Sequence, residues 1–262
     1  MSDQQIRFED GAAYEEIMGK WSRLAGDVFL DWLAPAKGLS WIDVGCGNGA
    51  FTELAIERCA PSEITGVDPS EGQLAYARSR PGARGARFQP GDAMALSFDA
   101  DRFDVAVMAL VIFFVPDPAK GVAEMLRVTK PGGLVAAYAW DIPGGGFPLE
   151  PVQAEMRAAG LKPPRPPSFE ISSIEPLRKL WSDAVLLDVD ARAISVRRIF
   201  DDFDAFWRAM MMGSALRAAI EQMPPADAAA LRERVRARLS TDGERRISYE
   251  ARANAVRGRV PG

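Results

Sequence analysis

The stretch from Trp41 to Phe51, Trp-Ile-Asp-Val-Gly-Cys-Gly-Asn-Gly-Ala-Phe, decides the fold of this chain. Apolar residues lead to the carboxylate of Asp43, and glycines follow at positions 45, 47 and 49. Residues 51–59 then have the composition of a helix. Glycine permits positive φ and lacks the Cβ atom that keeps a backbone away from a ligand. The stretch therefore predicts a strand, a tight turn and a helix N-terminus, an arrangement suited to binding a nucleoside cofactor.

Strand and helix patterns alternate through the first half of the chain. Strands are predicted at 40–44, 63–68, 86–89, 103–108 and 134–140, helices at 51–59, 71–79 and 120–128, and a turn at 130–133. This alternation predicts right-handed βαβ units and a Rossmann-like, doubly wound α/β sheet that is mostly parallel. Ligands bind outside the carboxyl ends of such strands, where Gly45, Asp68, Asp92 and Ala109 are expected to meet.

The second half is expected to add a cover and the last strands. Helices are predicted at 150–159, 173–182 and 203–223, and strands at 184–196 and 247–256, the last one antiparallel beside the sixth. A single domain is expected over 1–262, with an N-terminal helical cover at 1–35 (its helix at 13–25) and helical lid insertions at 141–172 and 201–240. The first insertion is rich in Gly and Pro, and its glycines 144–146 are predicted to act as a hinge.

Composition narrows the function. The 262 residues carry a net charge of −4, with 48% apolar and 26% charged residues, which is a globular profile without a nucleic-acid footprint spread over the whole surface. Neither a membrane span nor a signal peptide is recognisable, so we expect a cytoplasmic location without membrane insertion. Histidine is absent, which excludes His-based nucleophilic machinery and His-ligated metals. Two cysteines, Cys46 and Cys59, make no disulfide framework, and no metal is expected. Chemistry is therefore expected to come from a bound cofactor.

Four segments now carry a family resemblance. They are Asp-Val-Gly-Cys-Gly-Asn-Gly at 43–49, Val-Asp-Pro-Ser at 67–70, Gly-Asp-Ala at 91–93 and Leu-Arg-Val-Thr-Lys-Pro-Gly-Gly at 126–133. Their order and spacing resemble the successive motifs of class I S-adenosylmethionine-dependent methyltransferases, and within them the small-molecule type related to the quinone-biosynthesis methyltransferases. The resemblance covers residues 10–140 strongly. It implies S-adenosyl-L-methionine as cofactor, S-adenosyl-L-homocysteine as product, and a small, apolar or aromatic acceptor.

The resemblance also implies roles for individual residues. The glycines would let the loop pass against the methionine part of the cofactor, and Asp43 would face its ammonium. Asp68 would accept both ribose hydroxyls, Asp92 would accept from the adenine amino group, and apolar contact to the base would come from Pro69, Leu74 and Met94. The alternative interpretation of Asp92 is an Asx-type turn after Gly91. The implied cofactor-binding residues are Tyr14, Met18, Trp21, Asp43, Gly45, Cys46, Gly47, Asn48, Asp68, Pro69, Asp92, Ala93 and Ala109.

Two alternatives stay open at this point. Gly45, Gly47 and Ala50 also fit a dinucleotide fingerprint, with Asp68 suitably downstream, so an NAD(P)-dependent oxidoreductase is the first alternative. A carboxylate at Asp43 would repel a pyrophosphate, however, which disfavours it. The second alternative is a non-catalytic S-adenosylmethionine-binding protein, because no general base stands out and the catalytic residues are unknown. The candidates for a base are Tyr14, Glu15, Asp141 and Glu150.

The acceptor is expected to be small and apolar. Residues 109–114 read Ala-Leu-Val-Ile-Phe-Phe, whereas amino-group methyltransferases acting on DNA or glutamine resemble one another in carrying Asn/Asp-Pro-Pro-aromatic at this place. The arginines at 232, 234, 236 and 238 are interpreted as the solvated face of an amphipathic helix rather than as a nucleic-acid patch. The Met- and aromatic-rich stretch 203–212 is either core or part of an acceptor pocket. The oligomeric state cannot be predicted.

Overall fold

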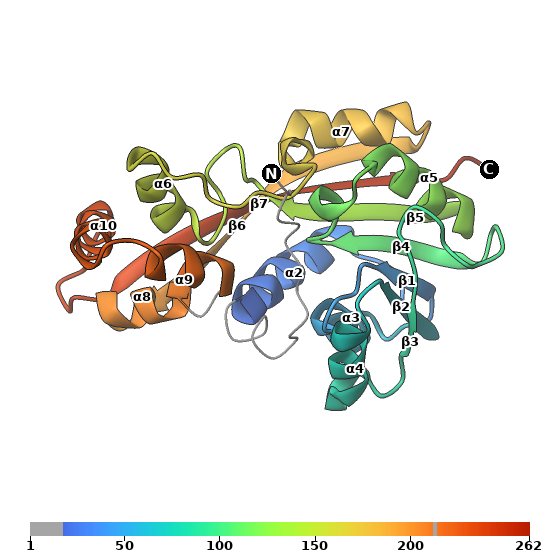
Figure 1. Ribbon diagram of the computed structural model, residues 1–262. Coiled ribbons are helices and arrows are strands. Elements are labelled where there is room, and N and C mark those ends of the chain that lie inside the picture. The colour runs from blue at the N-terminus through green and yellow to red at the C-terminus, as the bar shows by residue number, and fades with distance from the viewer. Residues whose placement is uncertain (1–17, 212–213) are drawn as a thin grey trace.

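The computed structural model describes residues 18–211 and 214–262. A seven-stranded sheet of order β3-β2-β1-β4-β5-β7-β6 forms its centre (Figure 1). Neighbours among the first five strands are parallel, and β7 is antiparallel to both β5 and β6. The predicted doubly wound sheet with an antiparallel last strand is confirmed. The strands are β1 (Ser40–Val44), β2 (Glu63–Asp68), β3 (Arg87–Pro90), β4 (Phe103–Ala109), β5 (Thr129–Trp140), β6 (Leu187–Phe200) and β7 (Ile247–Arg259).

Helices cover both faces of the sheet. In Figure 1, α2, α3 and α4 lie below the sheet, and α5 and α7 lie above it. On the lower face the ring of Phe29 in α2 lies 4.6 Å from that of Tyr138 in β5. The helices are α2 (Lys20–Leu33), α3 (Ala50–Cys59), α4 (Glu71–Ser79), α5 (Pro118–Val128), α6 (Glu150–Ala158), α7 (Ile174–Asp183), α8 (Phe203–Met211), α9 (Ser214–Glu221) and α10 (Pro225–Arg238).

Local signals explain several element boundaries. Strand β4 is almost entirely buried, as its near-continuous apolar run predicts for a central parallel strand. The side chain of Ser70 caps α4 by accepting from the N–H of Gln73, and the side chain of Asp117 caps α5 by accepting from that of Lys120. Pro118 then occupies the first turn of α5, where no N–H partner is needed.

The structure corrects three predicted elements. Within the described residues, the helix expected at 13–25 is α2, which begins at Lys20 and runs past Gly26 to Leu33. A Cβ atom at Gly26 would lie 2.7 Å from Cδ2 of Leu54, so this glycine lets α2 approach α3. Residues 130–133 belong to β5 rather than to a free turn, since Gly132 and Gly133 pair with Val260 beyond β7. The single helix expected at 203–223 is two helices, α8 and α9.

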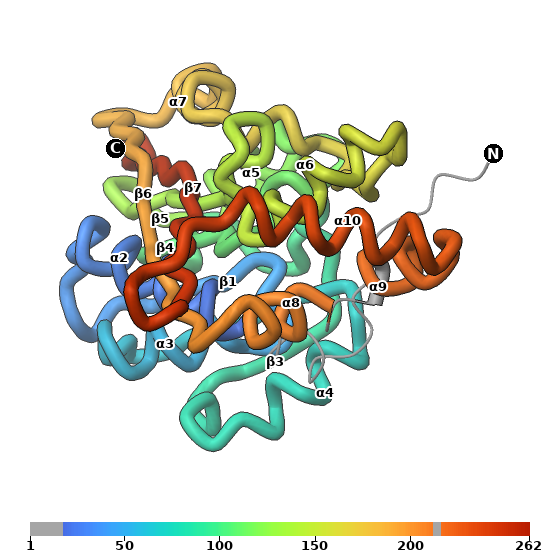
Figure 2. Tube along the Cα trace, turned by 90° about the vertical axis from the view of Figure 1, so that its left-hand side faces the viewer, coloured from blue at the N-terminus to red at the C-terminus, as the bar shows by residue number. Residues whose placement is uncertain are grey.

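Strands β6 and β7 project beyond the rest of the sheet at its carboxyl edge. The end of β5, Trp140, pairs with Ala253, whereas β7 begins six residues earlier at Ile247, opposite Phe200 of β6. Helices α8, α9 and α10 connect β6 to β7 at this projecting end. Figure 2, which looks toward that side, shows α8 and α10 in front of the sheet. The second insertion therefore lies at the edge where this fold binds its ligands.

Candidate functional site

The turn after β1 is held against β2 and against the loop after β4. The N–H groups of Gly45 and Cys46 both donate to the carbonyl of Val67, at 2.7 and 3.0 Å. Gly45 has φ +77°, and a Cβ atom on it would lie 2.4 Å from Cγ1 of Val111. The left-handed backbone and the close neighbour each require glycine at this position. The turn is thus fixed by its surroundings.

The middle of the turn has open space above it. Gly47 has φ +50°, and the nearest atom to a Cβ placed on it would be 4.0 Å away. Its N–H donates to Oδ2 of Asp68 at 2.9 Å. Gly49, with φ +78°, is the N-cap residue just before α3, and a Cβ there would lie 2.9 Å from the Cβ of Ala77 in α4. Gly45 and Gly49 therefore serve close packing, while Gly47 leaves room for a ligand against the backbone.

Asp68, the last residue of β2, joins the turn to the start of α4. Its Oδ2 accepts from Gly47, and its Oδ1 accepts from the N–H of Ser70 at 2.8 Å. Burial raises the pKa of this carboxyl, and the two backbone hydrogen bonds oppose the rise. Each carboxylate oxygen offers about two acceptor positions. Both oxygens therefore keep capacity for further donors such as hydroxyl groups.

Asp43, near the end of β1, is fully buried, and only one of its two carboxylate oxygens has a hydrogen-bond partner among the described residues. Its Oδ2 accepts from the hydroxyl of Thr52 in α3 at 2.6 Å. Its Oδ1 has no hydrogen-bond partner among the residues that the structure describes. Burial raises the pKa of the Asp43 carboxyl to about 7; the Thr52 hydrogen bond lowers it, and the nearby charge of Asp68 raises it. A buried carboxylate without a cation is complementary to a positively charged ligand group.

This raised pKa predicts that binding of a cationic ligand depends on pH. The ammonium of S-adenosylhomocysteine favours ionised Asp43, so binding must expel the proton that this group holds below pH 7. We expect the dissociation constant, measured by calorimetry, to be about tenfold higher at pH 6 than at pH 8. In Asp43→Asn the binding should be weaker and this pH dependence should disappear. A flat profile for the unaltered chain would contradict the assignment.

Cys46 and Asn48 are structural parts of the turn. Both are buried, and burial raises the pKa of the Cys46 thiol well above its ordinary value, so this thiol is no nucleophile at neutral pH. Oδ1 of Asn48 accepts from the N–H of Ala50 at 3.2 Å, and its carbonyl accepts from Nε of Arg80 at 2.6 Å. Their predicted cofactor contacts remain predictions.

The segment predicted to bind the adenine lies beside β2. Asp92 is exposed, and its Oδ1 accepts from the N–H of Met94 at 2.8 Å, which is the Asx-type turn considered from the sequence. Ala93 and Met94 are half-buried, and Pro69 is exposed. Leu74, by contrast, is fully buried in α4, which argues against its predicted contact with the base.

The N-terminal cover can be described in part. Tyr14 lies outside the described residues. Met18 is buried, and Trp21 is fully buried against the projecting strands, with its ring 6.5 Å from that of Phe200 and 6.0 Å from that of Tyr249. These contacts give Trp21 a packing role between α2 and the strands β6 and β7. Whether Met18 or Trp21 also touches a cofactor stays a prediction.

The sequence missed three residues that complete the site. Ala109 ends β4 half-buried, as expected, but Val111, two residues later, is the side chain that packs on Gly45. Thr52 holds Asp43, and Trp140 ends β5 beside this loop. The spacing of Thr52 nine residues after Asp43, on the inner face of the first helix, was a signal for the first contact. No local pattern points to the other two residues.

The predicted base candidates that can be described are paired. Asp141 accepts from Nε and Nη2 of Arg252, at 2.9 and 2.7 Å, and Glu150 forms an ion pair with Arg157. Tyr14 and Glu15 lie outside the described residues. An arginine side chain thus already occupies each of these two carboxylates. None of the described candidates is therefore assigned as a general base.

The glycines of the first insertion are packed rather than free. A Cβ atom at Gly144 would lie 2.2 Å from Oδ2 of Asp141, and one at Gly146 would lie 2.5 Å from the carbonyl of Arg252. Backbone hydrogen bonds also join Gly146 to Asp141 and to Arg252. This corner is clamped to β7, which argues against the predicted hinge at 144–146.

The arginines of α10 bind the two insertions to each other. Leu231 and Val235 of this helix are fully buried, which confirms its amphipathic pattern. The arginine side chains form ion pairs with Glu155 in α6, which is buried, and with Asp204 in α8. The pairs are Arg232–Asp204 at 2.7 Å, Arg234–Glu155 at 3.1 Å, Arg236–Asp204 at 3.6 Å and Arg238–Glu155 at 3.0 Å. The four arginines therefore form ion pairs with other parts of the same chain.

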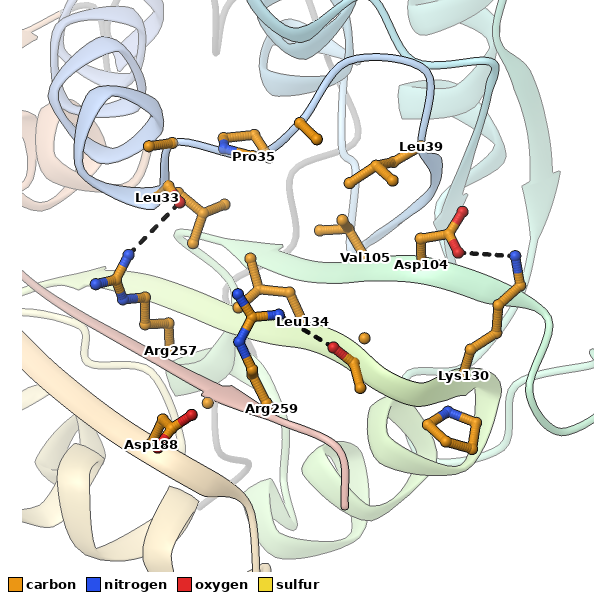
Figure 3. A pocket seen from close by; sticks show the side chains of 16 residues that line it. Leu33, Pro35, Leu39, Asp104, Val105, Lys130, Leu134, Asp188, Arg257 and Arg259 are labelled. Carbon is orange, nitrogen blue, oxygen red and sulfur yellow. Dashed lines mark hydrogen bonds and ion pairs between the residues drawn. The ribbon is translucent and has the colours of Figure 1, made fainter. Parts of the chain in front are cut away.

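Two grooves lie away from the glycine turn. One, of about 650 Å³, is at the amino edge of the sheet, between Pro35, Lys130 and Arg259 (Figure 3). The other, of about 620 Å³, lies between α6, α9 and α10 and is lined by Met156 and Met223. The first groove is at the edge opposite the carboxyl ends of the parallel strands, and it contains none of the predicted site residues. We assign it no role in the chemistry.

Two further findings concern the described ranges 18–211 and 214–262 only. Within them, no group of three or more Cys, Asp or Glu side chains is arranged to hold a metal ion. No helix in that part of the chain has both the length and the apolar character that crossing a membrane requires.

Comparisons with known proteins agree with this geometry. Residues 42–137 match the family described as "Methyltransferase domain". The rice (Oryza sativa subsp. japonica) 2-methyl-6-phytyl-1,4-hydroquinone methyltransferase 2 is 37% identical over 127 residues, which cover 46% of this chain and 36% of that protein. Demethylmenaquinone methyltransferase of Bacteroides fragilis is 35% identical over 117 residues, which cover 43% of this chain and 46% of the relative. The alignment thus spans less than half of each relative.

A solved structure extends the likeness over nearly the whole fold. Phosphoethanolamine N-methyltransferase 2 of Haemonchus contortus, in complex with S-adenosyl-L-methionine, matches with a TM-score of 0.57. The match covers 95% of this chain and 56% of that one, at 19% sequence identity, so it concerns the fold. Together with the family match and the glycine turn, it identifies the architecture. Residues 42–137 are thus similar to a methyltransferase domain, and the chain has the fold of the class I S-adenosylmethionine-dependent methyltransferases.

Proposed function

We propose that this chain transfers a methyl group from S-adenosylmethionine to a small, largely apolar aromatic acceptor and releases S-adenosylhomocysteine. The observation that carries the proposal is Asp43. Its buried carboxylate has one oxygen without a partner among the described residues and lies at the base of a glycine turn. The ammonium of the methionine moiety supplies the missing cation, whereas a pyrophosphate would be repelled. An NAD(P)-dependent oxidoreductase is disfavoured on this ground, and the comparisons offer it no support.

The other site residues fit the remaining parts of the cofactor. The open space over Gly47 suits the methionine chain, and the spare acceptor capacity of Asp68 suits two ribose hydroxyls. Asp92 is proposed to accept from the adenine amino group, with Ala93 beside the ring and Pro69 near it. In this arrangement Cys46 and Asn48 shape the turn, and Met18 and Trp21 belong to the cover.

The chain's own contribution is to orient the reactants and exclude water. When bound, S-adenosylmethionine supplies an electrophilic methyl group. The buried side chains of Leu110, Ile112 and Phe113 surround the end of β4 with an apolar wall, which keeps water away from the reacting atoms. Because Asp141 and Glu150 are ion-paired, the acceptor is proposed to be nucleophilic without a protein base, as the ring carbon of an electron-rich hydroquinone is. Hydroquinone appears in the name of the rice relative.

The two insertions are proposed to form one acceptor-selecting cover. Helix α10 connects α6 to α8 through Glu155 and Asp204, so the insertions 141–172 and 201–240 are joined by ion pairs. Their aromatic side chains include Phe203 and Phe206, whose rings lie 6.3 Å apart. A cover of this kind favours a hydrophobic acceptor. The N-terminal helix completes it through Trp21.

Calorimetry and a transfer assay test the proposal. S-adenosylhomocysteine should bind, and NAD should show no comparable binding, because only the former carries an ammonium for Asp43. Radiolabelled S-adenosylmethionine should then pass its methyl group to at least one member of a panel of hydroquinones and phenols. Binding of NAD tighter than that of S-adenosylhomocysteine would contradict the cofactor assignment. Binding of the cofactor without transfer to any acceptor would leave a non-catalytic binding protein.

A further inference from the structure

Trp140 has a buried indole N–H group at the carboxyl edge of the sheet, and this polar group lacks a hydrogen-bond partner among the described residues. Trp140 is the last residue of β5, and its side chain is only 1% exposed. Its indole Nε1–H has no acceptor among the residues that the structure describes. Nε1 of the buried Trp181, in α7, donates to the carbonyl of Val135 at 3.0 Å, whereas Nε1 of Trp21 and Nε1 of Trp41 also lack an acceptor among the described residues. What distinguishes Trp140 is its place at the carboxyl end of β5. A buried donor without an acceptor is unfavourable, so such a donor suggests a ligand.

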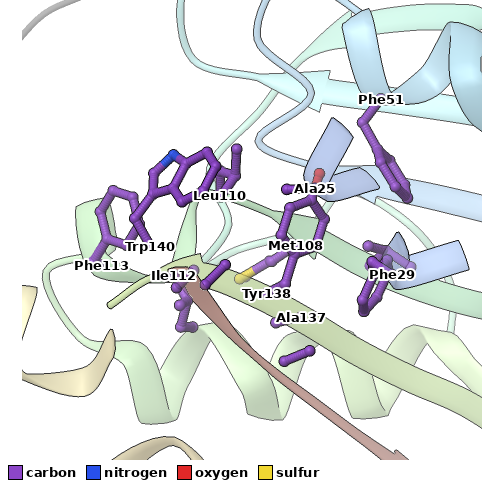
Figure 4. Close-up of a cluster of buried hydrophobic side chains, with 14 of the residues drawn as sticks. Ala25, Phe29, Phe51, Met108, Leu110, Ile112, Phe113, Ala137, Tyr138 and Trp140 are labelled. Atoms are coloured by element: carbon purple, nitrogen blue, oxygen red, sulfur yellow. The ribbon is translucent and has the colours of Figure 1, made fainter. Parts of the chain in front are cut away.

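The loop after β4 brings Trp140 close to the proposed cofactor site. Figure 4 shows the Trp140 ring between Leu110 and Phe113. The next residue after Leu110 is Val111, which is the side chain that closes on Gly45. The segment from Leu110 to Phe113 therefore has one residue against the glycine turn and others drawn next to the indole in Figure 4. In a parallel α/β sheet the ligand lies at this carboxyl edge.

The same loop carries a second unfavourable feature. Leu110 has φ +63°, a left-handed conformation that branched, bulky residues rarely adopt. Its N–H donates to the carbonyl of Tyr138 at 2.8 Å, which holds it in place. Strained backbone of this kind gathers at functional sites. Strain at Leu110 and an unsatisfied indole at Trp140 thus occur side by side, on independent observations.

We infer that the Nε1–H of Trp140 donates a hydrogen bond to an oxygen atom of the methyl acceptor. The inference rests on the proposed function and specifies its acceptor as a flat aromatic ring bearing a phenolic, quinol or carbonyl oxygen. Leu110, Ile112 and Phe113 are buried apolar side chains of the loop after β4, and they make the surroundings of the proposed ring site apolar. A neutral N–H selects an oxygen acceptor and disfavours an ammonium group, which has no lone pair to offer. Trp140 is a positioning residue that fixes which ring edge faces the methyl group.

Other indoles provide internal references. The chain has six tryptophans, and each gives one indole signal in an ¹H–¹⁵N spectrum. Nε1 of Trp41 also lacks a described acceptor, but this residue lies in β1 beside Val105, toward the amino end of β4. Trp181 is already bonded to Val135. Neither signal should respond to a molecule bound at the end of β5.

The test uses 1-naphthol and 1-methylnaphthalene, which have the same ring system and differ in the oxygen. With the full chain saturated with S-adenosylhomocysteine, 1-naphthol should shift the Trp140 indole proton downfield, and 1-methylnaphthalene should not. The Trp140→Phe variant assigns the signal. It should bind 1-naphthol about three- to tenfold more weakly and 1-methylnaphthalene within about twofold of the unaltered chain. In the matched Trp181→Phe variant, the ratio of the affinities for 1-naphthol and 1-methylnaphthalene should stay as in the unaltered chain.

Several results would overturn the inference. One is an unmoved Trp140 signal while 1-naphthol binds; another is an equal loss of affinity for both probes in Trp140→Phe, which would indicate packing alone. A chain that binds S-adenosylhomocysteine but neither probe also contradicts it. The proposed function fails separately, when S-adenosylhomocysteine itself does not bind. If the Trp140→Phe protein fails to fold, triple-resonance experiments on the unaltered chain assign the Trp140 signal, and the comparison of the two probes still decides the question.

Discussion

Replacing Gly45 by alanine is expected to remove most of the cofactor affinity. The new Cβ atom would lie 2.4 Å from Cγ1 and 2.7 Å from Cγ2 of Val111, and the backbone at this position has φ +77°. Overpacking and left-handed strain each oppose the native turn, so either the turn shifts or the loop after β4 does. We expect the binding free energy of S-adenosylhomocysteine to weaken by about 2–4 kcal/mol. Calorimetry and a thermal unfolding curve of the same preparation measure the effect.

Two variants separate the collision from the backbone strain. Gly132→Ala places alanine at φ +74° with no atom within 4 Å of the new Cβ, at the opposite edge of the sheet. It should lower thermal stability slightly and leave binding unchanged. Val111→Ala removes both colliding methyl groups, so the double variant with Gly45→Ala should recover part of the affinity. An affinity of Gly45→Ala within about threefold of the unaltered chain would show that the turn does not bind the cofactor.

The sequence predicted the elements that are bounded by local signals. Strand β2 runs from Glu63 to Asp68 as expected, because its apolar run stops at Pro69, and Ser70 then caps α4. Strand β1 likewise ends where the glycines begin. Such boundaries depend on neighbouring residues and can be read along the chain. The glycine turn and its carboxylates were recognisable for the same reason.

Elements that depend on tertiary contacts could not be predicted in this way. The helix predicted to end at residue 25 runs on through Gly26, where α2 and Leu54 of α3 pack too closely for a Cβ atom. The isolation of Asp43 Oδ1 depends on everything that surrounds β1, and the contact between Gly45 and Val111 joins residues 66 positions apart. The unsatisfied indole of Trp140 likewise follows from burial. Sequence motifs indicated where the cofactor binds, but not what completes the acceptor side.

Removing the carboxylate of Asp68 is expected to have the other large effect. The Asp68→Ala variant would lose the two hydrogen bonds that are proposed to hold the ribose. It would also lose the hydrogen bond that the N–H of Gly47 donates to Oδ2 of Asp68 at 2.9 Å. Hydrogen bonds to a charged acceptor contribute about 1.5–3 kcal/mol each. We therefore expect Asp68→Ala to weaken S-adenosylhomocysteine binding by roughly 2–4 kcal/mol while the chain stays folded. Calorimetry gives the affinity, and the unfolding curve gives the stability.

The ribose contact can be separated from the loop contact by changing the ligand. If Asp68 binds the hydroxyls, the unaltered chain should prefer adenosine to 2′-deoxyadenosine, and Asp68→Ala should bind the two nucleosides equally, because the residue that distinguishes them is gone. If Asp68 only supports the turn through Gly47 and Ser70, both nucleosides should lose affinity by the same factor and the preference should survive. Asp92→Ala is the matched control, since this exposed carboxylate bonds its own turn at Met94 and is proposed to face the adenine. It should weaken both nucleosides alike and leave their ratio as in the unaltered chain. A preference for adenosine that persists in Asp68→Ala would assign the ribose to another residue.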